Sequence, residues 1–585
     1  MASLFEATPG RYRVQVNNAT IALAGESGDG IISLGEILTK VLAKMGLHVL
    51  TFRTYPAEVR GGQCIFTINA QHETTLCQGD DYDILLCTDA TAYNLNKGRL
   101  KGSGIVIYNS ESHTHDDMPM ISYGVPLRTL TKSIEATGSK NILMLGVLAD
   151  LVNLDMEIIG NLLEEKWGKR LEIIERNRLA LKSGWDWAAS NLIKKDEFKF
   201  QVIKAIERLL VSGNEALCLG AMAAGCKFFA GYPITPATDM LEWLMNRLPK
   251  MGGVAMQIED EISALGAVLG ASFSGVRAMT ATSGPGFALM TELVNLAGAA
   301  EIPIVIVDVQ RAGPSTGMPT KTEQSDLYHA AFGGPGESPR IVIAPTDVTD
   351  CFYQIMKAFN LADKYQLPVI LLSDQSLSHR HEAILTPNPK LVPIVRPKRP
   401  SSDELEKYYR YLRTEDGVSS MSIPGMMGGQ YVATGIERDE IGLPSYQPEN
   451  HELNMRKRMK KLERAAEEDA ELEHFGAADA KIGVISWGST AGAVKEAVQY
   501  AISKGINVTS LHPKMLFPVP KKQIGTWASK IITILVVEVN QFGQYHHMLQ
   551  AELGRDMHSF RKTTGLPFTP REIFKRIEEV SKHGG

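Results

Sequence analysis

Short apolar runs alternate with amphipathic helical segments from the start of the chain. In the first part, the pattern predicts strands at Thr20–Ala24, His48–Arg53, Ile84–Cys87 and Gly104–Tyr108, and helices at Ile31–Met45 and Asn141–Lys166. Gly46 suits the position that ends the first helix, because glycine adopts the left-handed conformation at little cost. Strands that alternate with helices indicate a doubly wound parallel sheet.

The same rhythm returns twice further along the chain. In the middle part, it predicts strands at Phe228–Ala230, Val254–Ile258, Val276–Thr282, Pro303–Val309, Arg340–Ala344 and Pro368–Leu372. In the last part, it predicts a strand at Lys481–Ser486, a helix at Ala491–Ser503 and a strand at Ile531–Val539. The predicted fold class is therefore α/β, with three doubly wound parallel-sheet domains.

Composition changes mark the expected domain boundaries. The proline-rich segment Pro387–Pro400 ends the middle domain, and Glu452–Glu473 interleaves both signs of charge at helical spacing, which is typical of a solvated helix. We expect domains at residues 1–190, 200–390 and 477–585, with a linker and lid region at residues 391–476. Three domains suit a chain of 585 residues.

Charge and cysteine content exclude several functional classes. The chain has 61 Lys and Arg against 66 Asp and Glu, a net charge of -5, so no basic surface for nucleic acid is expected. We also expect no membrane span and no secretory signal, hence a cytoplasmic location. None of the six cysteines forms a C-x-x-C pair, so we expect no metal or iron–sulfur site in this chain and interpret them as small buried hydrophobes.

Four polar features follow consecutive predicted strands of the middle domain. They are Thr235 in Gly231–Pro236, Glu261 after Asp260, Ser283 in the turn Thr282–Gly286, and Arg311 in Arg311–Gly317. Because ligands bind at the carboxyl ends of strands in open α/β sheets, we expect these residues to converge on one crevice.

Each feature alone has an ordinary structural explanation. Thr235 precedes Pro236, which favours the first helical turn, so Thr235 is a candidate N-cap whose helix would attract a carboxylate. Glu261 would gain from a helix dipole or, facing an apolar crevice, would have a raised pKa. Glycines near Ser283 allow a backbone to approach a ligand, and Arg311 can bind a carboxylate through two hydrogen bonds.

Together the four features resemble the α subunit of the 2-oxoacid:ferredoxin oxidoreductases. The resemblance covers nearly the whole chain. Gly25–Gly30 with Arg60-Gly-Gly62 resembles the γ domain of that family, fused in front; Gly488-Ser-Thr490 and Glu538–Gln544 resemble its transketolase-type C-terminal domain. The γ–α fusion, with Thr434–Glu440, is most similar to the members that act on 2-oxoglutarate.

The resemblance implies a thiamine diphosphate enzyme whose pyrimidine side lies on this chain. Glu261 would hydrogen-bond the aminopyrimidine and promote its imino form. The other implied cofactor contacts are Tyr232, Pro233, Ser283, Gly284 and Gly286. Thr235 and Arg311 would contact the substrate near the reacting carbon, with Thr320, Lys321 and Asp439 on the substrate side. Lys321, His512, Lys514 or a residue of another subunit could hold the second carboxylate of 2-oxoglutarate.

The resemblance also implies partners, because the chain lacks the family's Mg²⁺-diphosphate and four-cysteine motifs. A β subunit would bring Mg²⁺ with the diphosphate site and a [4Fe-4S] cluster, coenzyme A would be the cosubstrate, and ferredoxin the electron partner. The implied assembly is an αβ dimer of dimers, with a place in the reductive TCA cycle. Three alternatives stay open: a pyruvate or branched-chain 2-oxoacid enzyme, a non-catalytic scaffold, and a dehydrogenase using Gly25–Gly30, whose spacing departs from G-x-G-x-x-G.

Overall fold

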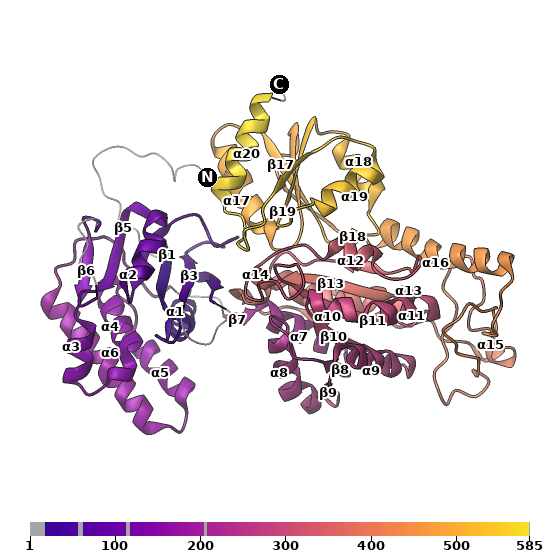
Figure 1. Ribbon diagram of the computed structural model, residues 1–585, viewed down its shortest axis with the longest axis horizontal. Coiled ribbons are helices and arrows are strands. Elements are labelled where there is room, and N and C mark those ends of the chain that lie inside the picture. The colour runs from indigo at the N-terminus through magenta and orange to yellow at the C-terminus, as the bar shows by residue number, and fades with distance from the viewer. Residues whose placement is uncertain (1–17, 57–61, 113–117, 204–206, 584–585) are drawn as a thin grey trace. The chain divides into compact units, whose positions relative to one another are not determined.

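The chain folds into two compact units, each described here by itself. The computed structural model describes residues 18–56, 62–112, 118–203 and 207–583, which contain three β-sheets flanked by helices (Figure 1). One unit extends to Leu210 and includes the returning segment His381–Thr386, and the other contains Val211–Arg380 and Pro387–Gly585. The α/β fold class is confirmed. None of the helices in the described ranges is long and apolar enough to cross a membrane.

The first unit is built on an eight-stranded sheet in the order β6-β5-β4-β1-β3-β2-β14-β7. Its strands are β1 Ala19–Glu26, β2 His48–Thr54, β3 Gln63–Gln71, β4 Tyr82–Cys87, β5 Leu100–Asn109, β6 Ser122–Val125, β7 Arg208–Ser212 and β14 His381–Leu385. The half from β6 to β1 is parallel, as predicted. In the other half, β3, which the apolar pattern did not predict, pairs antiparallel with both β1 and β2.

Six α-helices cover this sheet: α1 Ile31–Lys44, α2 Ala90–Asn96, α3 Leu127–Ser133, α4 Lys140–Val152, α5 Met156–Trp167 and α6 Leu171–Asn191. Gly46 follows α1 with φ of 98°, as predicted. The single helix predicted at Asn141–Lys166 is wrong. The chain turns at Asn153, whose φ is 58°, and Asp155 then caps α5 by accepting hydrogen bonds from two backbone N–H groups.

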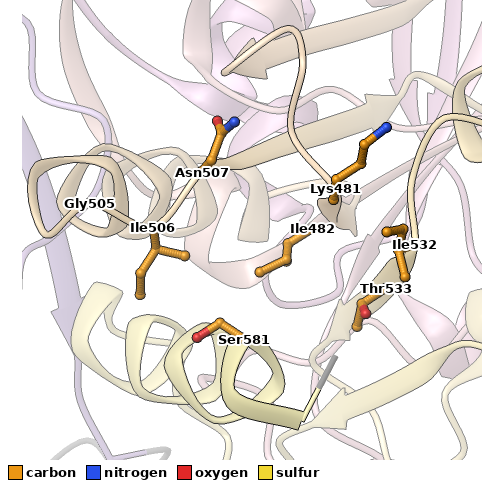
Figure 2. Close-up of a pocket in the computed structure, with 8 residues that line it drawn as sticks. All are labelled: Lys481, Ile482, Gly505, Ile506, Asn507, Ile532, Thr533 and Ser581. Atoms are coloured by element: carbon orange, nitrogen blue, oxygen red, sulfur yellow. The ribbon is translucent and has the colours of Figure 1, made fainter. Parts of the chain in front are cut away.

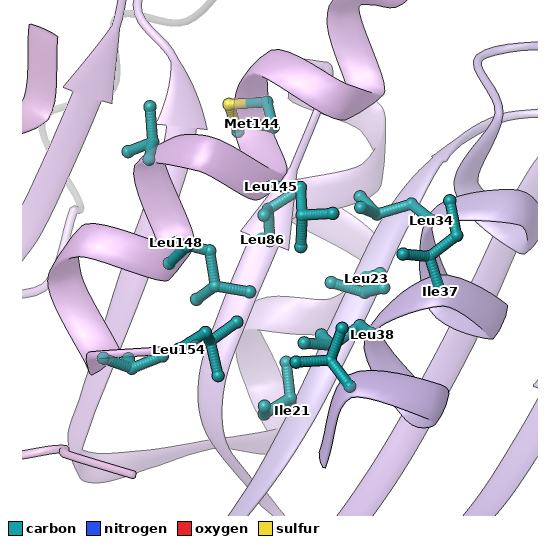
Figure 3. Close-up of a cluster of buried hydrophobic side chains, with 14 of the residues drawn as sticks. Ile21, Leu23, Leu34, Ile37, Leu38, Leu86, Met144, Leu145, Leu148 and Leu154 are labelled. Carbon is teal, nitrogen blue, oxygen red and sulfur yellow. The ribbon is translucent and has the colours of Figure 1, made fainter. Parts of the chain in front are cut away.

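The core of the first unit forms where α1 and α4 pack on the sheet. Figure 3 shows Leu34, Ile37 and Leu38 of α1 facing Ile21 and Leu23 of β1, with Met144, Leu145 and Leu148 of α4 close by. The labelled side chains are almost completely buried. Burial of a leucine side chain contributes roughly 1.5–3 kcal/mol, so these contacts hold α1 and α4 on the sheet.

The second unit contains a seven-stranded sheet in the order β18-β12-β13-β11-β10-β8-β9. Its strands are β8 Phe228–Gly231, β9 Val254–Gln257, β10 Ala278–Thr282, β11 Ile304–Gln310, β12 Ile341–Ile343, β13 Pro368–Asp374 and β18 Met515–Phe517. All neighbouring strands from β12 to β9 pair in parallel. The surrounding helices are α7 Gly213–Ala223, α8 Thr238–Arg247, α9 Glu261–Phe273, α10 Gly284–Leu289, α11 Thr291–Ala300, α12 Leu327–Phe332, α13 Val348–Tyr365 and α14 Gln375–Ser378.

The same unit contains a five-stranded sheet in the order β15-β17-β16-β19-β20. Its elements are β15 Leu472–Gly476, β16 Ile482–Ser486, α17 Thr490–Ser503, β17 Val508–Pro513, α18 Lys521–Ala528, β19 Thr533–Glu538, α19 Gln544–Leu553, β20 His558–Arg561 and α20 Pro570–His583. β18 leaves this region and pairs antiparallel with β12, at the edge of the seven-stranded sheet. The two sheets therefore share a continuous core.

The segment between these sheets is mostly irregular, with α15 Ser402–Glu406 and α16 Pro448–Glu468. The prediction of a solvated helix at Glu452–Glu473 is wrong for one face of the helix, which is buried. Lys457 and Lys461 of α16 are buried, and both donate to the buried carboxylate of Glu301. This carboxylate compensates part of their charge, which is how two lysines come to lie inside the fold. The helix also ends earlier than predicted, because Leu472–Gly476 is strand β15.

Candidate active site

The four predicted site residues follow four neighbouring parallel strands. Thr235 follows β8, Glu261 follows β9, Ser283 follows β10 and Arg311 follows β11, in a sheet where β11, β10, β8 and β9 lie side by side. The carboxyl ends of parallel strands meet at one edge of a sheet. The structure thus brings these residues to one edge of the sheet.

Thr235 does not cap a helix. Helix α8 begins only at Thr238, with Ala237 in the capping position. The carbonyl oxygen of Ile234 accepts hydrogen bonds from the N–H groups of Ala237 (2.8 Å) and Thr238 (3.0 Å), which forms a turn before the helix. The N-cap prediction for Thr235 is therefore wrong. Thr235 lies in this turn, and its carbonyl oxygen accepts a hydrogen bond from Arg311.

Glu261 is the first residue of α9 and is 5% exposed. The neighbouring Asp260 caps the helix by accepting from Ser263 N–H at 2.6 Å, so that role does not fall to Glu261. No hydrogen bond or ion pair of the described residues involves the Glu261 carboxylate, and its oxygens are not fully buried. The oxygens therefore keep some contact with solvent, which a hydrogen-bond donor on a ligand can replace.

The turn after β10 brings backbone close to Glu261. A Cβ placed on Gly286 would lie 2.3 Å from Glu261 Oε1, so only glycine fits there. The Ser283 hydroxyl is buried and has no hydrogen-bond partner among the described residues. Tyr232 and Pro233 follow β8 and are partly exposed, Tyr232 at 40%. The site therefore has one hydroxyl without a hydrogen-bond partner among the described residues. Beside the carboxylate, glycine leaves room for a ligand to approach the backbone.

Arg311 is hydrogen-bonded to one backbone carbonyl and is influenced by the charge of two carboxyl groups. Its Nη1–H donates to the Thr235 carbonyl oxygen at 2.7 Å, and its Nε has no partner within the described residues. Burial lowers the pKa of Arg311, and the nearby carboxyl groups of Asp326 and Asp308 oppose that shift. Arg311 stays charged, because an arginine pKa lies far above neutrality. Part of its hydrogen-bonding capacity is thus left for a ligand.

Thr320 and Lys321 lie on a loop that returns to Arg311. The N–H of Ala312 donates to the Lys321 carbonyl oxygen at 3.0 Å, and Met318 N–H donates to the Ala312 carbonyl oxygen at 2.8 Å. Gly317 makes this return possible, since its φ is 49° and a Cβ there would lie 1.9 Å from the Ala312 oxygen. Thr320 is buried and Lys321 is half-buried, with its pKa lowered by burial.

Asp439 is placed differently from the other predicted residues. Its Oδ1 accepts hydrogen bonds from the N–H groups of Ile441 (3.1 Å) and Leu443 (2.9 Å), so its carboxylate closes a local turn. No hydrogen bond or ion pair of the described residues joins it to Arg311 or Thr235. The structure therefore gives Asp439 a local structural contact and leaves its substrate role a prediction.

The C-terminal motifs hold the end of the site loop. Gln324 donates from Nε2 to the Trp487 carbonyl oxygen (2.8 Å), and its Oε1 accepts from Thr490 Oγ1 (2.8 Å) and Val539 N–H (3.1 Å). Sequence reasoning did not single out Gln324. Glu538 is completely buried, and its carboxylate accepts hydrogen bonds from Trp487 and Asn540 side chains and from the N–H groups of Tyr545 and His546.

Two candidate cations for a second substrate carboxylate are engaged elsewhere. His512 lies between the hydroxyls of Ser486 and Ser510, each 2.9 Å away, and burial lowers its pKa to about 3. It is therefore neutral near pH 7. Burial opposes protonation of Lys514, but the carboxylates of Asp350 and Glu473, at 2.8 and 2.9 Å, raise its pKa above the ordinary value. Neither side chain offers a free positive charge.

A pocket of about 380 Å³ lies in the C-terminal sheet, away from all the predicted site residues. Figure 2 shows it lined by Lys481, Ile482, Gly505, Ile506, Asn507, Ile532, Thr533 and Ser581. These residues lie where β16, β17 and β19 begin, apart from Ser581 on α20. Ligands of parallel sheets bind at the opposite, carboxyl ends, so this pocket is a poor candidate for the active site.

The glycine turn of the first unit is filled by its own side chains. A Cβ on Gly25 would lie 2.2 Å from the Thr88 hydroxyl, and one on Gly30 would lie 2.5 Å from Asn141 Nδ2. The Thr88 hydroxyl donates to Asp29 at 3.1 Å. These contacts explain the glycines as a tight structural turn. Arg60 and Gly61 lie outside the described residues. All six cysteines are buried thiols outside any disulfide, as predicted.

Comparison with known protein families covers most of the chain. The thiamine diphosphate-binding model of pyruvate flavodoxin/ferredoxin oxidoreductases matches residues 219–457. The pyruvate ferredoxin/flavodoxin oxidoreductase model matches residues 20–187, and core domain II of pyruvate:ferredoxin oxidoreductase matches residues 480–570. Each of the three sheets thus contributes to a match with the same group of enzymes.

Curated relatives and a solved structure agree with these matches. The 2-oxoglutarate oxidoreductase subunit KorA of Mycobacterium tuberculosis is 33% identical over 98% of this chain and 93% of its own length. The 2-oxoglutarate synthase subunit KorA of Methanothermobacter thermautotrophicus is 38% identical over 64% of this chain and its whole length. A solved structure is also similar: 2-oxoglutarate:ferredoxin oxidoreductase from Magnetococcus marinus with 2-oxoglutarate, coenzyme A and succinyl-CoA bound. It superposes on this chain with a TM-score of 0.92 and is 39% identical in sequence, and the match covers 96% of this chain and 99% of that one. This chain therefore belongs to the 2-oxoacid:ferredoxin oxidoreductase family, as the sequence predicted.

Proposed function

We propose that this chain is the α subunit of a 2-oxoglutarate:ferredoxin oxidoreductase. The reaction interconverts 2-oxoglutarate, coenzyme A and oxidised ferredoxin with succinyl-CoA, CO₂ and reduced ferredoxin. The proposal is supported by relatives named for 2-oxoglutarate at more than 30% identity and by the solved enzyme that holds 2-oxoglutarate and succinyl-CoA. The observation that carries it is the convergence of Thr235, Glu261, Ser283 and Arg311 at the ends of four adjacent strands.

The buried polar atoms of this edge fit the pyrimidine side of thiamine diphosphate. No described residue donates to the Glu261 carboxylate, and the buried Ser283 hydroxyl has no partner among the described residues. The backbone at Gly286 lies so close to Glu261 that a Cβ there would be 2.3 Å from Oε1. When bound, the cofactor supplies the nucleophilic carbon and the electron sink for decarboxylation. Glu261 accepts a hydrogen bond from the ring nitrogen and holds the proton there, while Ser283, Gly284, Tyr232 and Pro233 orient the ring.

Arg311 and Thr235 bind the substrate beside this ring. The Arg311 guanidinium has an unpaired Nε–H that can donate to the 1-carboxylate, and its bond to the Thr235 carbonyl fixes its direction. The Thr235 hydroxyl donates to the 2-oxo group. Thr320 and Lys321 lie on the loop paired with Ala312 and contact the distal carboxylate. Asp439 lies on the substrate side, at its own turn.

The remaining parts of the reaction come from a partner. Among the described residues, no group of three or more His, Cys, Asp or Glu side chains is arranged to hold a metal ion. Mg²⁺ with the diphosphate site and a [4Fe-4S] cluster belong to a β subunit, which passes electrons to ferredoxin. The assembly is an αβ dimer of dimers in the cytoplasm, acting in the reductive TCA cycle.

Co-purification of the chain with its β subunit tests this proposal. The chain alone should show no 2-oxoacid-dependent dye reduction. It should also show no iron–sulfur absorbance at about 400 nm, because it lacks the set of thiolate ligands that a cluster needs. With the β subunit, thiamine diphosphate, Mg²⁺ and coenzyme A, it should reduce dye with 2-oxoglutarate. Activity of the isolated chain, or an assembled complex that ignores 2-oxoglutarate and prefers pyruvate, would contradict the proposal.

A further inference from the structure

A carboxyl group lies inside the central strand of the seven-stranded sheet. Asp308 belongs to β11, whose sequence Ile304–Gln310 is otherwise almost wholly apolar, and it is 0% exposed. Its neighbours across the strand are Thr282 of β10 and Leu372 of β13, neither of which carries a charge. Asp308 lies two residues before Gln310 and therefore on the same face of the strand.

A second carboxyl group faces Asp308. Asp326 occupies the capping position of α12 but makes no side-chain cap, and its Oδ2 is buried without a protein donor. Its backbone N–H donates to Gln310 Oε1 at 3.1 Å, which holds the segment over β11. No protein group donates to either oxygen of Asp308 or to Asp326 Oδ2, all three are buried, and the two carboxyl groups act on each other. Two carboxylates cannot donate to each other, so burial of the pair favours a state in which one of them carries a proton.

The pair influences two parts of the proposed site, one for the substrate and one for the cofactor. Both carboxyl groups act on Arg311 through their charge. A Cβ on Gly284, in the turn beside Ser283, would lie 2.7 Å from Asp326 Oδ2, so this carboxyl also packs against the turn. The remaining charged group facing the pair is Glu323, which accepts from Gly313 N–H (3.3 Å) and Ser325 Oγ (3.2 Å).

We propose that Asp308 and Asp326 share one proton and position Arg311 and the Ser283–Gly286 turn for substrate and cofactor. With one proton, the pair carries a single negative charge that balances Arg311 without binding it rigidly. Loss of the proton would place two negative charges in a buried site, and gain of a second would leave Arg311 unbalanced. Both aspartates are positioning residues. Their role in turnover rests on the proposed function of Arg311.

Burial and the charge of the neighbour set the direction of titration. Burial and Asp326 raise the pKa of Asp308 well above its ordinary value, and burial raises the pKa of Asp326 to about 6. The folded pair therefore binds more protons than the unfolded chain at every pH from about 4 up to the folded pKa of Asp308, which lies well above the ordinary value. Its contribution to the free energy of unfolding is largest below about pH 4 and falls as the pH rises through the folded pKa values.

The first test needs no turnover. In D308N, the amide can donate to Asp326 and removes the shared proton, so infrared difference spectra of the full chain should lose a protonated-carboxyl band that the parent shows. The thermal midpoint of D308N relative to the parent should rise as the pH increases from about 5 to 8, since the folded parent keeps a proton that the unfolded parent has released. Glu538→Gln is the matched control, because that carboxylate already has N–H donors and should show no such trend.

The second test uses the assembled enzyme. D326N removes the negative charge beside Arg311 and should change the KM for the 2-oxoacid about tenfold, equivalent to one pK unit of interaction, with a smaller change in kcat. The kcat/KM profile of D308N should lose an inflection that the parent shows near pH 6. A parent without a protonated carboxyl, or a D308N offset independent of pH, would overturn the pair. Intact spectra with unchanged KM and pH profiles would overturn only its positioning role.

Discussion

Two buried glutamates at strand ends of the second unit have opposite surroundings. Glu538, at the end of β19, is completely buried and accepts hydrogen bonds from four protein groups. Glu261, just after β9, is 5% exposed as a residue, but no described residue donates to its carboxylate, and the oxygens keep some contact with solvent. Buried carboxylates normally have hydrogen-bond partners, as Glu538 does. The difference separates a carboxylate that holds the fold together from one that is prepared for a ligand.

The same contrast extends to the residues around each glutamate. Around Glu538, Gln324 and Asn540 use their side chains to connect the C-terminal sheet with the site loop. Around Glu261, the Ser283 hydroxyl and the Arg311 Nε lack partners within the described residues. Unsatisfied groups cost stability, so they persist where function requires them.

Substitution of Glu261 should produce the largest effect on activity. Glu261→Gln keeps the size of the side chain but cannot hold a proton from the cofactor ring, so kcat should fall about 10²–10⁴-fold in the assembled enzyme. The free energy of unfolding should change little, because no protein donor is lost. Single-turnover decarboxylation and a thermal melt of the same preparation measure both quantities. A rate within about twofold of the parent would remove Glu261 from the chemistry.

Arg311→Lys tests the substrate side of the same edge. Lysine keeps the charge but loses the planar pair of donors, so kcat/KM should fall roughly ten- to a hundredfold for every 2-oxoacid, as for a lost charged hydrogen bond. 2-Oxoglutarate and pyruvate kinetics on one preparation provide the measurement. A loss confined to 2-oxoglutarate would instead place Arg311 at the distal carboxylate.

Glu538→Gln should affect stability rather than chemistry. The new amide places N–H donors where protein donors already point, and each unsatisfied buried group costs about 1–3 kcal/mol. Chemical denaturation should show that loss, while kcat per folded enzyme stays close to that of the parent. If Glu538→Gln lowered kcat as strongly as Glu261→Gln without loss of stability, the distinction between the two glutamates would fail.

The sequence predicted the strands of the site more reliably than the contacts between them. Apolar runs located β8, β10 and β11 to within two residues at each end, because burial in a parallel sheet leaves a plain signal. β3 was missed because it adds an antiparallel partner from a segment that also contains polar residues.

Polar contacts were less predictable because they depend on distant segments. The capping role expected of Thr235 fails because the turn from Ile234 delays helix α8 by two residues. Gln324 and Asp326 stand in a polar stretch that has no motif of its own, and their partners lie on β11 and in the C-terminal region. His512 resembled a free cation in sequence, yet two serines and burial make it a neutral core residue.

Lys321 should produce the smallest effect, and it concerns substrate choice alone. Lys321→Met keeps the length of the side chain and removes the charge that the loop carries beside Arg311. The preference for 2-oxoglutarate over pyruvate should fall roughly fivefold, the size expected of an ion pair of about 1 kcal/mol, while pyruvate turnover changes little. Competition between the two substrates in one reaction measures the ratio directly. Lys390→Met, at an exposed lysine, is the control for loss of a charge, and Thr320→Val tests the neighbouring hydroxyl. If neither Lys321→Met nor Thr320→Val alters the ratio, the second carboxylate is recognised by the partner subunit, and the unsatisfied edge of this chain serves only the reacting end of the substrate.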